Sequence, residues 1–291
     1  MRHQTVDPEA PPVVSRVDLH AHTTASDGLL APAELVKLAS QRGLSVLGVT
    51  DHDTIDGLAE AMAMASETGV TLVPGVELST SIGGHEVHLL GYFVDPADDA
   101  FLARLRDLAG SRKRRIVRMV ERLNELGYPI AIEPILAQAE HGTIGRPHVA
   151  RALIDLGVVK DINEAFERFL KPGKPGWVER ERFTPEDAIA LIRANNAIPV
   201  LAHPFTTGNV DATLERLVPA GLRGLEVFYG EYSPTQHAQL QAYAEQWNLA
   251  PTGGSDYHGP RFKEGRELGT APVPEWVYAR LKTMHEEPAG R

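Results

Sequence analysis

Two histidines separated by one residue, His20 and His22, are the first feature of this sequence that could carry chemistry. They lie in a short run with alternating apolar residues, Arg-Val-Asp-Leu-His-Ala-His. In a β-strand, residues i and i+2 point to the same face, so both imidazole rings would leave the strand on one side. Two rings in this arrangement could bind one metal ion, although an isolated pair is more often an ordinary surface or core feature.

Histidine and carboxylate residues recur at the ends of other apolar runs along the chain. The residues concerned are His52, Glu77, His88, His203, Asp256 and His258. At a single strand end, such residues are ordinary caps or turn formers. Their repetition at successive strand ends indicates one shared site for several metal ions, because clustered buried imidazoles and carboxylates are costly without a cation.

These candidate ligands require a fold that brings distant strand ends together. Short β-branched runs predict strands, and they alternate with amphipathic patterns that predict helices. The predicted strands span residues 16–22, 45–50, 71–78, 86–93, 198–202, 224–228 and 250–253. The predicted helices span residues 32–41, 58–68, 185–195, 211–218 and 234–246. This alternation predicts an α/β fold with a parallel sheet closed into a barrel, and with the ligands at the carboxyl ends of its strands.

The alternation stops between residues 100 and 182, where helical segments follow one another. Residues 100–183 contain 16 Lys and Arg against 11 Asp and Glu, whereas the rest of the chain contains 13 against 28. We therefore expect a barrel domain of residues 16–99 and 183–291 and a basic helical insertion of residues 100–182. Residues 1–15 are polar and rich in proline and predict a disordered tail.

The composition excludes several classes of protein. With 43% hydrophobic residues in 291, the chain can bury a full core and is not disordered. The formal net charge of −10 argues against binding of long duplex nucleic acid. The sequence has no cysteine, which excludes thiolate metal sites and a cysteine nucleophile and is typical of a reducing compartment. No apolar stretch is long enough to cross a membrane, so we expect a cytoplasmic protein.

Taken in order, these motifs resemble those of the PHP (polymerase and histidinol phosphatase) superfamily of metal-dependent phosphoesterases. The resemblance extends from residue 16 to residue 270 and includes the His-x-His, Thr-Asp-His-Asp and Asp-x-His motifs. The string Ile-Gly-Arg-Pro-His-Val-Ala-Arg at residues 144–151 is similar to the branch that contains nucleoside 3′,5′-bisphosphate phosphatases and 5′-to-3′ exoribonucleases. The resemblance implies a distorted (β/α)7 TIM-like barrel.

The same resemblance implies two to three divalent metal ions at the carboxyl end of the barrel. His20, His22, Glu77 and Asp256 would bind the first ion, Glu77, His88 and His203 the second, and Asp27, His52 and His258 the third. Some family members have histidine where this chain has Asp27, so the third site is richer in oxygen ligands and better suited to Mn²⁺, Fe²⁺ or Mg²⁺. For the whole site we expect Mn²⁺ first, with Fe²⁺, Zn²⁺ or Mg²⁺ as alternatives. Ions bridged by a carboxylate activate a water molecule and neutralise phosphoryl oxygens, so no covalent intermediate is needed.

Outside the metal ligands, the resemblance implies roles for Arg146 and His148. The Arg146 guanidinium would grip a phosphate in bidentate fashion, and His148 would contact a phosphate or the leaving group. We therefore take both, together with Glu77 and His203, as candidate catalytic residues. The alternative is an ordinary helix start, with Pro147 in the first turn and Arg146 paired with a surface carboxylate.

A second candidate anion site lies on the helix expected from residue 111 to residue 126. Arg115, Arg118 and Arg122 recur at helical spacing beside an apolar stripe. We take Arg115 and Arg118 as candidate substrate contacts. Most arginine stripes are only solvated faces, and this is the alternative.

The sequence therefore predicts a hydrolase that acts on nucleotide phosphates. The expected substrates are a nucleoside 3′,5′-bisphosphate, which loses its 3′-phosphate, and short 5′-phosphorylated single-stranded RNA, which is degraded 5′ to 3′. One alternative is a phosphatase that acts on histidinol phosphate or phosphotyrosine. Another is a non-catalytic binding module that metal ions stabilise.

Overall fold

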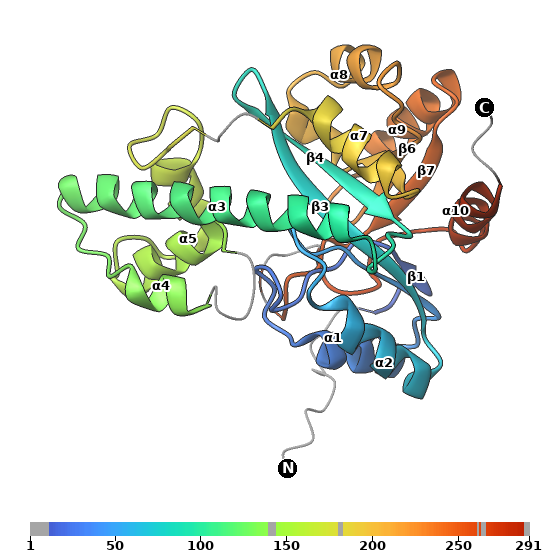
Figure 1. The fold of residues 1–291 in the computed structure, drawn as a ribbon, viewed down its shortest axis with the longest axis horizontal. Coiled ribbons are helices and arrows are strands. Elements are labelled where there is room, and N and C mark those ends of the chain that lie inside the picture. The colour runs from blue at the N-terminus through green and yellow to red at the C-terminus, as the bar shows by residue number, and fades with distance from the viewer. Residues whose placement is uncertain (1–11, 139–143, 180–182, 261, 263–265, 288–291) are drawn as a thin grey trace.

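The computed structural model describes residues 12–138, 144–179, 183–260, 262 and 266–287 (Figure 1). Within these residues, the centre is a seven-stranded sheet whose spatial order follows the sequence. The strands are β1 Val17–Asp18, β2 Val46–Val49, β3 Thr71–Ile82, β4 His85–Tyr92, β5 Ile198–Leu201, β6 Gly224–Tyr229 and β7 Ala250–Gly254. The two edges meet, since the backbone N–H of Leu19 donates to Gly253 O at 3.1 Å. The sheet is thus nearly closed into a barrel, which confirms the predicted fold class.

The sheet departs at β4 from the parallel arrangement that the alternation predicted. β4 is antiparallel to both β3 and β5, whereas the other neighbours are parallel. Gly83 and Gly84 join β3 to β4 with φ values of 56° and 86°, and a two-residue hairpin turn needs such positive values. The reversal brings the first half of β4, which contains His88, to the edge where the parallel strands end.

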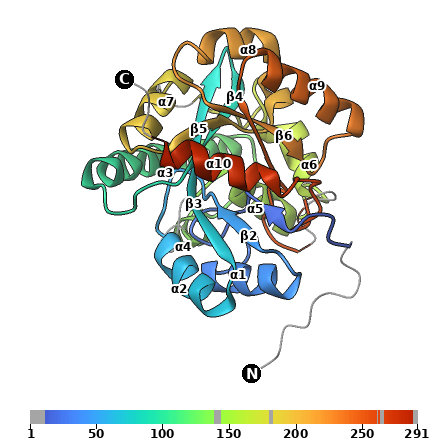
Figure 2. The same ribbon diagram turned by 90° about the vertical axis from the view of Figure 1, so that its right-hand side faces the viewer.

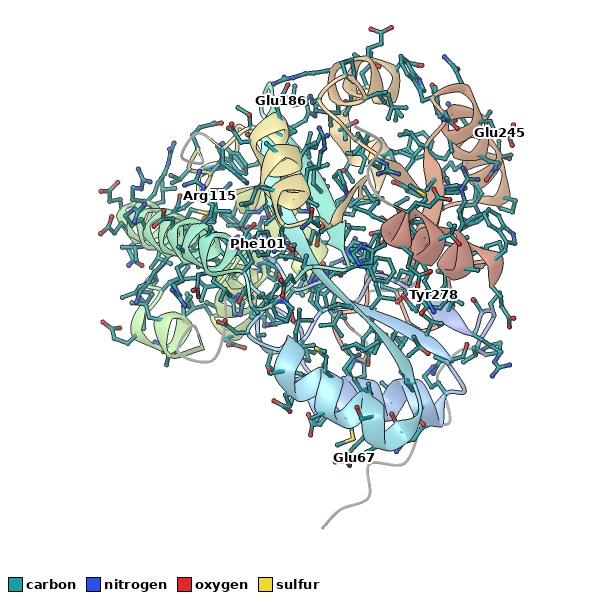
Figure 3. All side chains as sticks on the ribbon, turned by 45° about the vertical axis from the view of Figure 1, so that its right-hand side comes forward. Glu67, Phe101, Arg115, Glu186, Glu245 and Tyr278 are labelled. Carbon is teal, nitrogen blue, oxygen red and sulfur yellow. The ribbon has the colours of Figure 1, made fainter. Side chains whose placement is uncertain are left out.

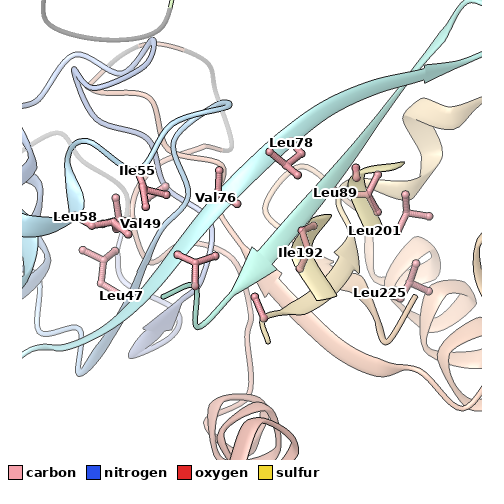
Figure 4. Packing of buried hydrophobic residues seen from close by; sticks show 14 of the residues in the cluster. Leu47, Val49, Ile55, Leu58, Val76, Leu78, Leu89, Ile192, Leu201 and Leu225 are labelled. Carbon is pink, nitrogen blue, oxygen red and sulfur yellow. The ribbon is translucent and has the colours of Figure 1, made fainter. Parts of the chain in front are cut away.

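Helices cover the outside of the barrel (Figures 1 and 2). They are α1 Pro32–Gln41, α2 Leu58–Thr68, α7 Pro185–Ala194, α8 Val210–Leu217 and α9 Pro234–Gln246, with a short 3₁₀ turn at Pro204–Thr207. Alternate strand residues such as Leu47, Leu78 and Leu201 pack in the main core beneath these helices (Figure 4). This pattern follows from the pleat, because successive side chains of a strand point to opposite faces.

The last helix, α10 Trp276–Glu286, lies across the strands in Figure 2 and was not among the predicted helices. Its Val277 and Leu281 pack with Val17, Val46 and Ala250 in a second core inside the barrel. These strand residues lie at the starts of parallel strands. The helix therefore closes the end of the barrel opposite the predicted metal ligands.

Among its described residues, the segment between β4 and α7 contains helices and connecting loops but no strand. It contains α3 Asp99–Glu125, α4 Glu133–Gln138, α5 Arg146–Asp155, α6 Ile162–Ala165 and a π-helical turn at Phe166–Leu170. α3 begins well before residue 111, where the sequence pattern placed its start. The Asp98 side chain causes this earlier start, because it accepts hydrogen bonds from the N–H groups of Ala100 and Phe101 and caps the helix.

α3 contributes to two separate hydrophobic cores. Near its start, Phe101 and Leu105 pack in the main core of the barrel. Farther along, Ile116 and Met119 pack in a third core whose members all come from the segment between β4 and α7. Figure 3 shows Phe101 at the barrel end of this helix and Arg115 farther out. The same rigid rod therefore connects the barrel to the helical segment.

Of the tail predicted at residues 1–15, residues 1–11 lie outside the described residues. The backbone N–H groups of Val14 and Ser15 donate to Gly269 O at 2.9 and 3.1 Å. The Ser15 hydroxyl also donates to Val273 O at 2.6 Å. The chain is thus fixed to the barrel before residue 16. In the described part of the chain, no helix is both long and apolar enough to cross a lipid bilayer.

Candidate active site

The nine residues predicted as metal ligands meet at one end of the barrel. They lie on β3 and β4 and in the segments that follow β1, β2, β5 and β7. The buried members are His20, His22, Asp27, His52, Glu77, His203, Asp256 and His258. The side chain of the ninth, His88, is only 12% exposed. The sequence pattern therefore identified residues that the fold does bring together.

The ligand atoms form three overlapping groups, in each of which all atoms lie within 4.8 Å of one another. The Asp27 cluster contains His22, Asp27, His52 and His258, the Asp256 cluster contains His20, His22, Glu77 and Asp256, and the His88 cluster contains His52, Glu77 and His88. Glu77 belongs to two of these clusters, and its bridging of two ions stays a prediction.

The composition of two groups differs from the prediction. The Asp27 cluster gains His22, and the His88 cluster contains His52 in place of the expected His203. His52 reaches Glu77 because the two residues form a parallel β-bridge. His203 remains close, since its Nε2 atom lies 3.0 Å from Glu77 Oε1.

The donor set fits divalent metal ions. Both ring nitrogens of His22 are buried and have no hydrogen-bond partner among the described residues. His22 Nε2 nevertheless lies 3.2 Å from Glu77 Oε2 and 3.1 Å from Asp256 Oδ1. Buried nitrogens without hydrogen bonds are costly, and a cation shared with these carboxylates would remove that cost. Imidazole and carboxylate donors are ligands that Mn²⁺, Fe²⁺ and Zn²⁺ accept.

The pKa values of individual residues in the clusters also indicate that the buried carboxylates require positive charge. Burial alone would lower the pKa of His22, but the carboxylates of Asp256 and Glu77 raise this pKa to about 10. Burial alone would raise the pKa of Glu77, but the imidazoles of His52 and His88 hold this pKa well below its usual range. In the metal-free protein, a proton on His22 therefore offsets part of the carboxylate charge.

A buried carboxylate outside the clusters, Glu226, orients two of the histidines. Its Oε1 atom lies 2.9 Å from His20 Nδ1, and its Oε2 atom accepts the backbone N–H of His203 at 2.6 Å. The first contact leaves His20 Nε2 to face the Asp256 cluster. Partners of this kind fix the tautomer and ring orientation of metal-binding histidines.

Three non-glycine residues at the site have left-handed backbone conformations. The φ values are 53° for Asp53, 28° for His203 and 54° for Asp256. Such conformations cost free energy and persist only where the surroundings impose them. The bond from His203 to Glu226 is one such restraint, and the Ser79 N–H that donates to Asp53 Oδ1 at 2.9 Å is another.

A cavity of about 340 Å³ borders the three clusters. The helical segment between β4 and α7 supplies its other main wall. Arg112, Arg115, Arg146 and Lys171 make that wall basic. An anion in this cavity would therefore face metal ligands on one side and cationic side chains on the other.

Arg146 lies in the basic wall, as its predicted role requires. It pairs with Glu86 of β4, which also lines the cavity. Its guanidinium carbon lies 4.8 Å from the centre of the Phe166 ring and 5.5 Å from that of Trp177. The carboxylate partner is thus a residue of the cavity itself, and two aromatic rings hold the guanidinium in place.

His148 closes the first turn of α5 and is not one of the described residues that line the cavity. Its Nδ1 atom accepts the backbone N–H of Gly145 at 3.0 Å. Burial holds the pKa of His148 below its usual value. His148 thus binds the start of its own helix, and its contact with a phosphate or the leaving group stays a prediction.

The two candidate arginines of α3 lie in different surroundings. Arg115 is buried and lines the cavity. Its Nε atom donates to Val178 O at 2.8 Å, and its guanidinium carbon lies 4.5 Å from the centre of the Trp177 ring. Arg118 is exposed and does not belong to the described cavity wall. The stripe predicted from spacing is therefore divided between the cavity and solvent.

Arg112, which the sequence analysis did not single out, also faces the cavity. Its Nε atom lies 2.7 Å from Asp53 Oδ2, and its Nη2 atom donates to Ser79 Oγ at 2.9 Å. Its position three residues before Arg115 could have indicated this, because residues at that spacing lie on neighbouring turns of one helix face.

Arg266 is a second cavity residue that sequence reasoning missed. Its Nη1 atom lies 2.6 Å from Asp256 Oδ2, and its Nε atom pairs with Glu231. The Tyr229 hydroxyl donates to the same Asp256 oxygen at 2.9 Å. Asp256 Oδ1 is thus the oxygen that faces the histidines. No local pattern marks Arg266, because only the fold brings it to the strand end.

Comparison with known proteins agrees with this geometry. The family model "PHP domain" matches residues 18–141. The chain is 36% identical to the 3′,5′-nucleoside bisphosphate phosphatase of Chromobacterium violaceum, over 95% of this chain and 100% of that protein. It is 33% identical to a 5′-3′ exoribonuclease of Haemophilus influenzae, over 91% of this chain and 99% of that protein.

Among solved structures, the fold matches a Bifidobacterium adolescentis protein assigned as a metal-dependent phosphoesterase. The TM-score is 0.85 at 31% sequence identity, and the match covers 97% of this chain and 100% of that one. Relatives this similar over nearly their whole length share a family with the chain. The protein therefore belongs to the PHP domain family of metal-dependent phosphoesterases.

Proposed function

We propose that this protein releases the 3′-phosphate of nucleoside 3′,5′-bisphosphates and degrades short 5′-phosphorylated RNA from its 5′ end at the same site. The names of the relatives from Chromobacterium violaceum and Haemophilus influenzae support these two activities. The observation that carries the proposal is the cavity, which has metal ligands on one side and a basic wall on the other. A substrate with one phosphate at each end of a nucleoside unit complements both sides.

The size of the cavity supports a small substrate. Its volume of about 340 Å³ lies at the lower end of the range found for small-molecule sites. A single nucleotide unit suits this space, whereas a long duplex does not. Degradation of RNA would then proceed one nucleotide at a time, and we expect no stable complex with long duplex nucleic acid.

Different residues of the chain would bind the metal ions and the phosphate groups of the substrate. The Asp27, Asp256 and His88 clusters would hold two to three divalent ions, with Mn²⁺ expected first and Fe²⁺, Zn²⁺ or Mg²⁺ as alternatives. When bound, such ions supply Lewis acidity and an activated water molecule near neutral pH. Glu77 supplies the charge that two clusters share, and Arg146 and Arg115 provide positive charge for the phosphate at the far wall.

The domain organisation is part of this proposal. Residues 16–99 and 183–291 would form the catalytic barrel, and residues 100–182 would act as a cap that supplies the basic wall. The third core, which draws its members only from the segment between β4 and α7, supports a cap with its own hydrophobic interior. The cytoplasmic location expected from the sequence stays a prediction.

A substrate panel tests the proposed function. The protein is loaded in turn with Mn²⁺, Fe²⁺, Zn²⁺ and Mg²⁺ and supplied with a nucleoside 3′,5′-bisphosphate, a short 5′-phosphorylated RNA, histidinol phosphate and phosphotyrosine. We expect 3′-phosphate release from the first substrate and mononucleotides from the second. Turnover confined to the last two would identify a different phosphatase, and no turnover by fully loaded protein would indicate a binding module.

A further inference from the structure

Arg112 carries a hydrogen-bond donor that none of the contacts described above uses. The residue is only 9% exposed. Its Nε atom faces Asp53 and its Nη2 atom donates to Ser79, as noted above. Its Nη1 atom is buried and has no hydrogen-bond partner among the described residues. A charged donor buried without a partner is costly, so this atom indicates a ligand on the cavity side of the side chain.

The space beside this donor is kept open by Gly145. A Cβ atom at that position would lie 3.5 Å from Asp27 Oδ2 and 3.7 Å from Arg112 Nη1. Both atoms therefore border the same small space, and all three residues line the cavity. The φ of Gly145 is −142° and its ψ is −179°, an extended conformation that any residue adopts. The backbone conformation therefore does not require glycine at this position. The absence of a side chain instead keeps the space beside Arg112 open.

The electrostatic surroundings of this space favour an anion. Arg112 brings a full positive charge. Gly145 is the N-cap of the ten-residue helix α5, so the positive end of the helix dipole also faces this region. The Asp27 carboxylate borders the same space, and its Oδ1 atom lies 3.3 Å from His258 Nε2.

We propose that Arg112 Nη1 and the N-terminus of α5 form an oxyanion subsite, which holds a non-bridging oxygen of the phosphoryl group at the Asp27 cluster. This inference rests on the proposed function and identifies the group that grips the reacting phosphate from the cap side. The same guanidinium binds Ser79, whose Oγ atom lies 3.3 Å from His52 Nδ1. A phosphate bound to Arg112 would therefore be connected through Ser79 to His52, a member of the Asp27 cluster.

Binding of inorganic phosphate to the manganese-loaded full-length protein tests the subsite without reference to a substrate. Arg112→Met removes the donor. Gly145→Ala fills the space and leaves the Arg112 contacts with Asp53 and Ser79 unchanged. Lys113→Ala, at an exposed neighbouring position on α3, is the matched control. Calorimetry gives the Kd for phosphate, and metal content is determined on the same samples.

We expect the Kd for phosphate to rise about tenfold to hundredfold in Arg112→Met and in Gly145→Ala, as for the loss of a charge-assisted hydrogen bond. Lys113→Ala should match the parent protein. Arg112→Lys should recover only part of the affinity, because a compact ammonium group cannot reproduce the widely spaced donors of the planar guanidinium. Metal content should remain that of the parent in Gly145→Ala.

Unchanged phosphate affinity in Gly145→Ala would overturn the subsite and leave Arg112 as a structural link between α3 and the barrel. If Arg112→Met does not fold or does not retain metal, Gly145→Ala and Arg112→Lys decide the question. Phosphate binding that follows the prediction, combined with no turnover of nucleotides, would refute the proposed substrates but keep the subsite.

Discussion

Glu226 Oε1 lies 2.9 Å from His20 Nδ1, and both side chains are completely buried. Because Nδ1 of His20 is engaged there, its Nε2 atom faces the cluster, 3.3 Å from Glu77 Oε2 and 3.4 Å from Asp256 Oδ1. The carboxylate that sets this ring orientation stands behind the site and would touch no substrate.

Glu226→Gln should lower metal affinity about tenfold to hundredfold, the usual effect of losing a partner that orients a metal-binding histidine. The amide keeps the shape of the side chain but not its negative charge. Competition with a chromophoric chelator measures the affinity, and Glu215→Gln at an exposed position of α8 is the control. Equal affinity in the two variants would show that Glu226 serves only the backbone of His203.

Glu77→Gln should remove most phosphoesterase activity and part of the bound metal while the protein stays folded. Glu77 belongs to both the Asp256 and the His88 clusters, and an amide cannot supply the negative charge that two cations need. Metal analysis and hydrolysis rates are measured on the same preparation. A near-normal rate with a full complement of metal would refute the bridging role.

Arg146→Ala should lower kcat/KM for a nucleoside 3′,5′-bisphosphate about tenfold to hundredfold, which corresponds to a charged hydrogen bond of about 1.5 to 3 kcal/mol. Arg146→Lys should recover only part of the loss, because an ammonium cannot reproduce the planar fork held between two rings. Steady-state kinetics with a substrate that lacks the second phosphate shows which phosphate Arg146 binds.

Glu86→Gln provides the companion test, since Glu86 is the present partner of Arg146. Without this carboxylate, the guanidinium would be free for substrate, and the KM for anionic substrates should fall. An unchanged KM in this variant and an unchanged kcat/KM in Arg146→Ala would together assign the pair a structural role.

The metal-free protein should lose stability as the pH rises through about 10. The pKa of His22 is about 10 in the folded protein and about 6.5 in an unfolded chain. The stability from this raised pKa is fully present below pH 6.5 and is lost as the pH rises toward 10. Ligation requires neutral imidazole, so metal-loaded protein should not show this loss. Thermal unfolding of chelator-treated and loaded protein should therefore give a Tm difference that widens over this pH range, whereas a constant difference would contradict it.

The candidate metal ligands could be predicted from the sequence because their signal is local. His20 and His22 stand two residues apart, and Asp256 and His258 repeat this spacing at the end of the last strand. A parallel barrel brings such strand ends together whatever the loop lengths are. The assignment of His203 to the second ion stays a prediction, because the division of ligands among ions depends on distances across the barrel.

The roles of Arg112 and Arg266 were missed because they depend on contacts between segments far apart in the chain. Arg112 meets Asp53 only when the insertion folds back on the barrel. Arg266 meets Asp256 through a loop without a recognisable pattern. The antiparallel β4 did have a local signal, because Gly83-Gly84 between two alternating runs is typical of a hairpin turn.

The continuity of α3 through both cores makes the basic wall depend on helical phase. Each residue of an α-helix turns the next by about 100° and advances it by about 1.5 Å. One residue inserted after Leu108 would leave the first turns of the helix packed on the barrel but rotate Arg112 and Arg115 away from the cavity. Relatives in which this helix differs in length by one or two residues ahead of Arg112 would therefore present another set of side chains to the phosphate, with every metal ligand unchanged.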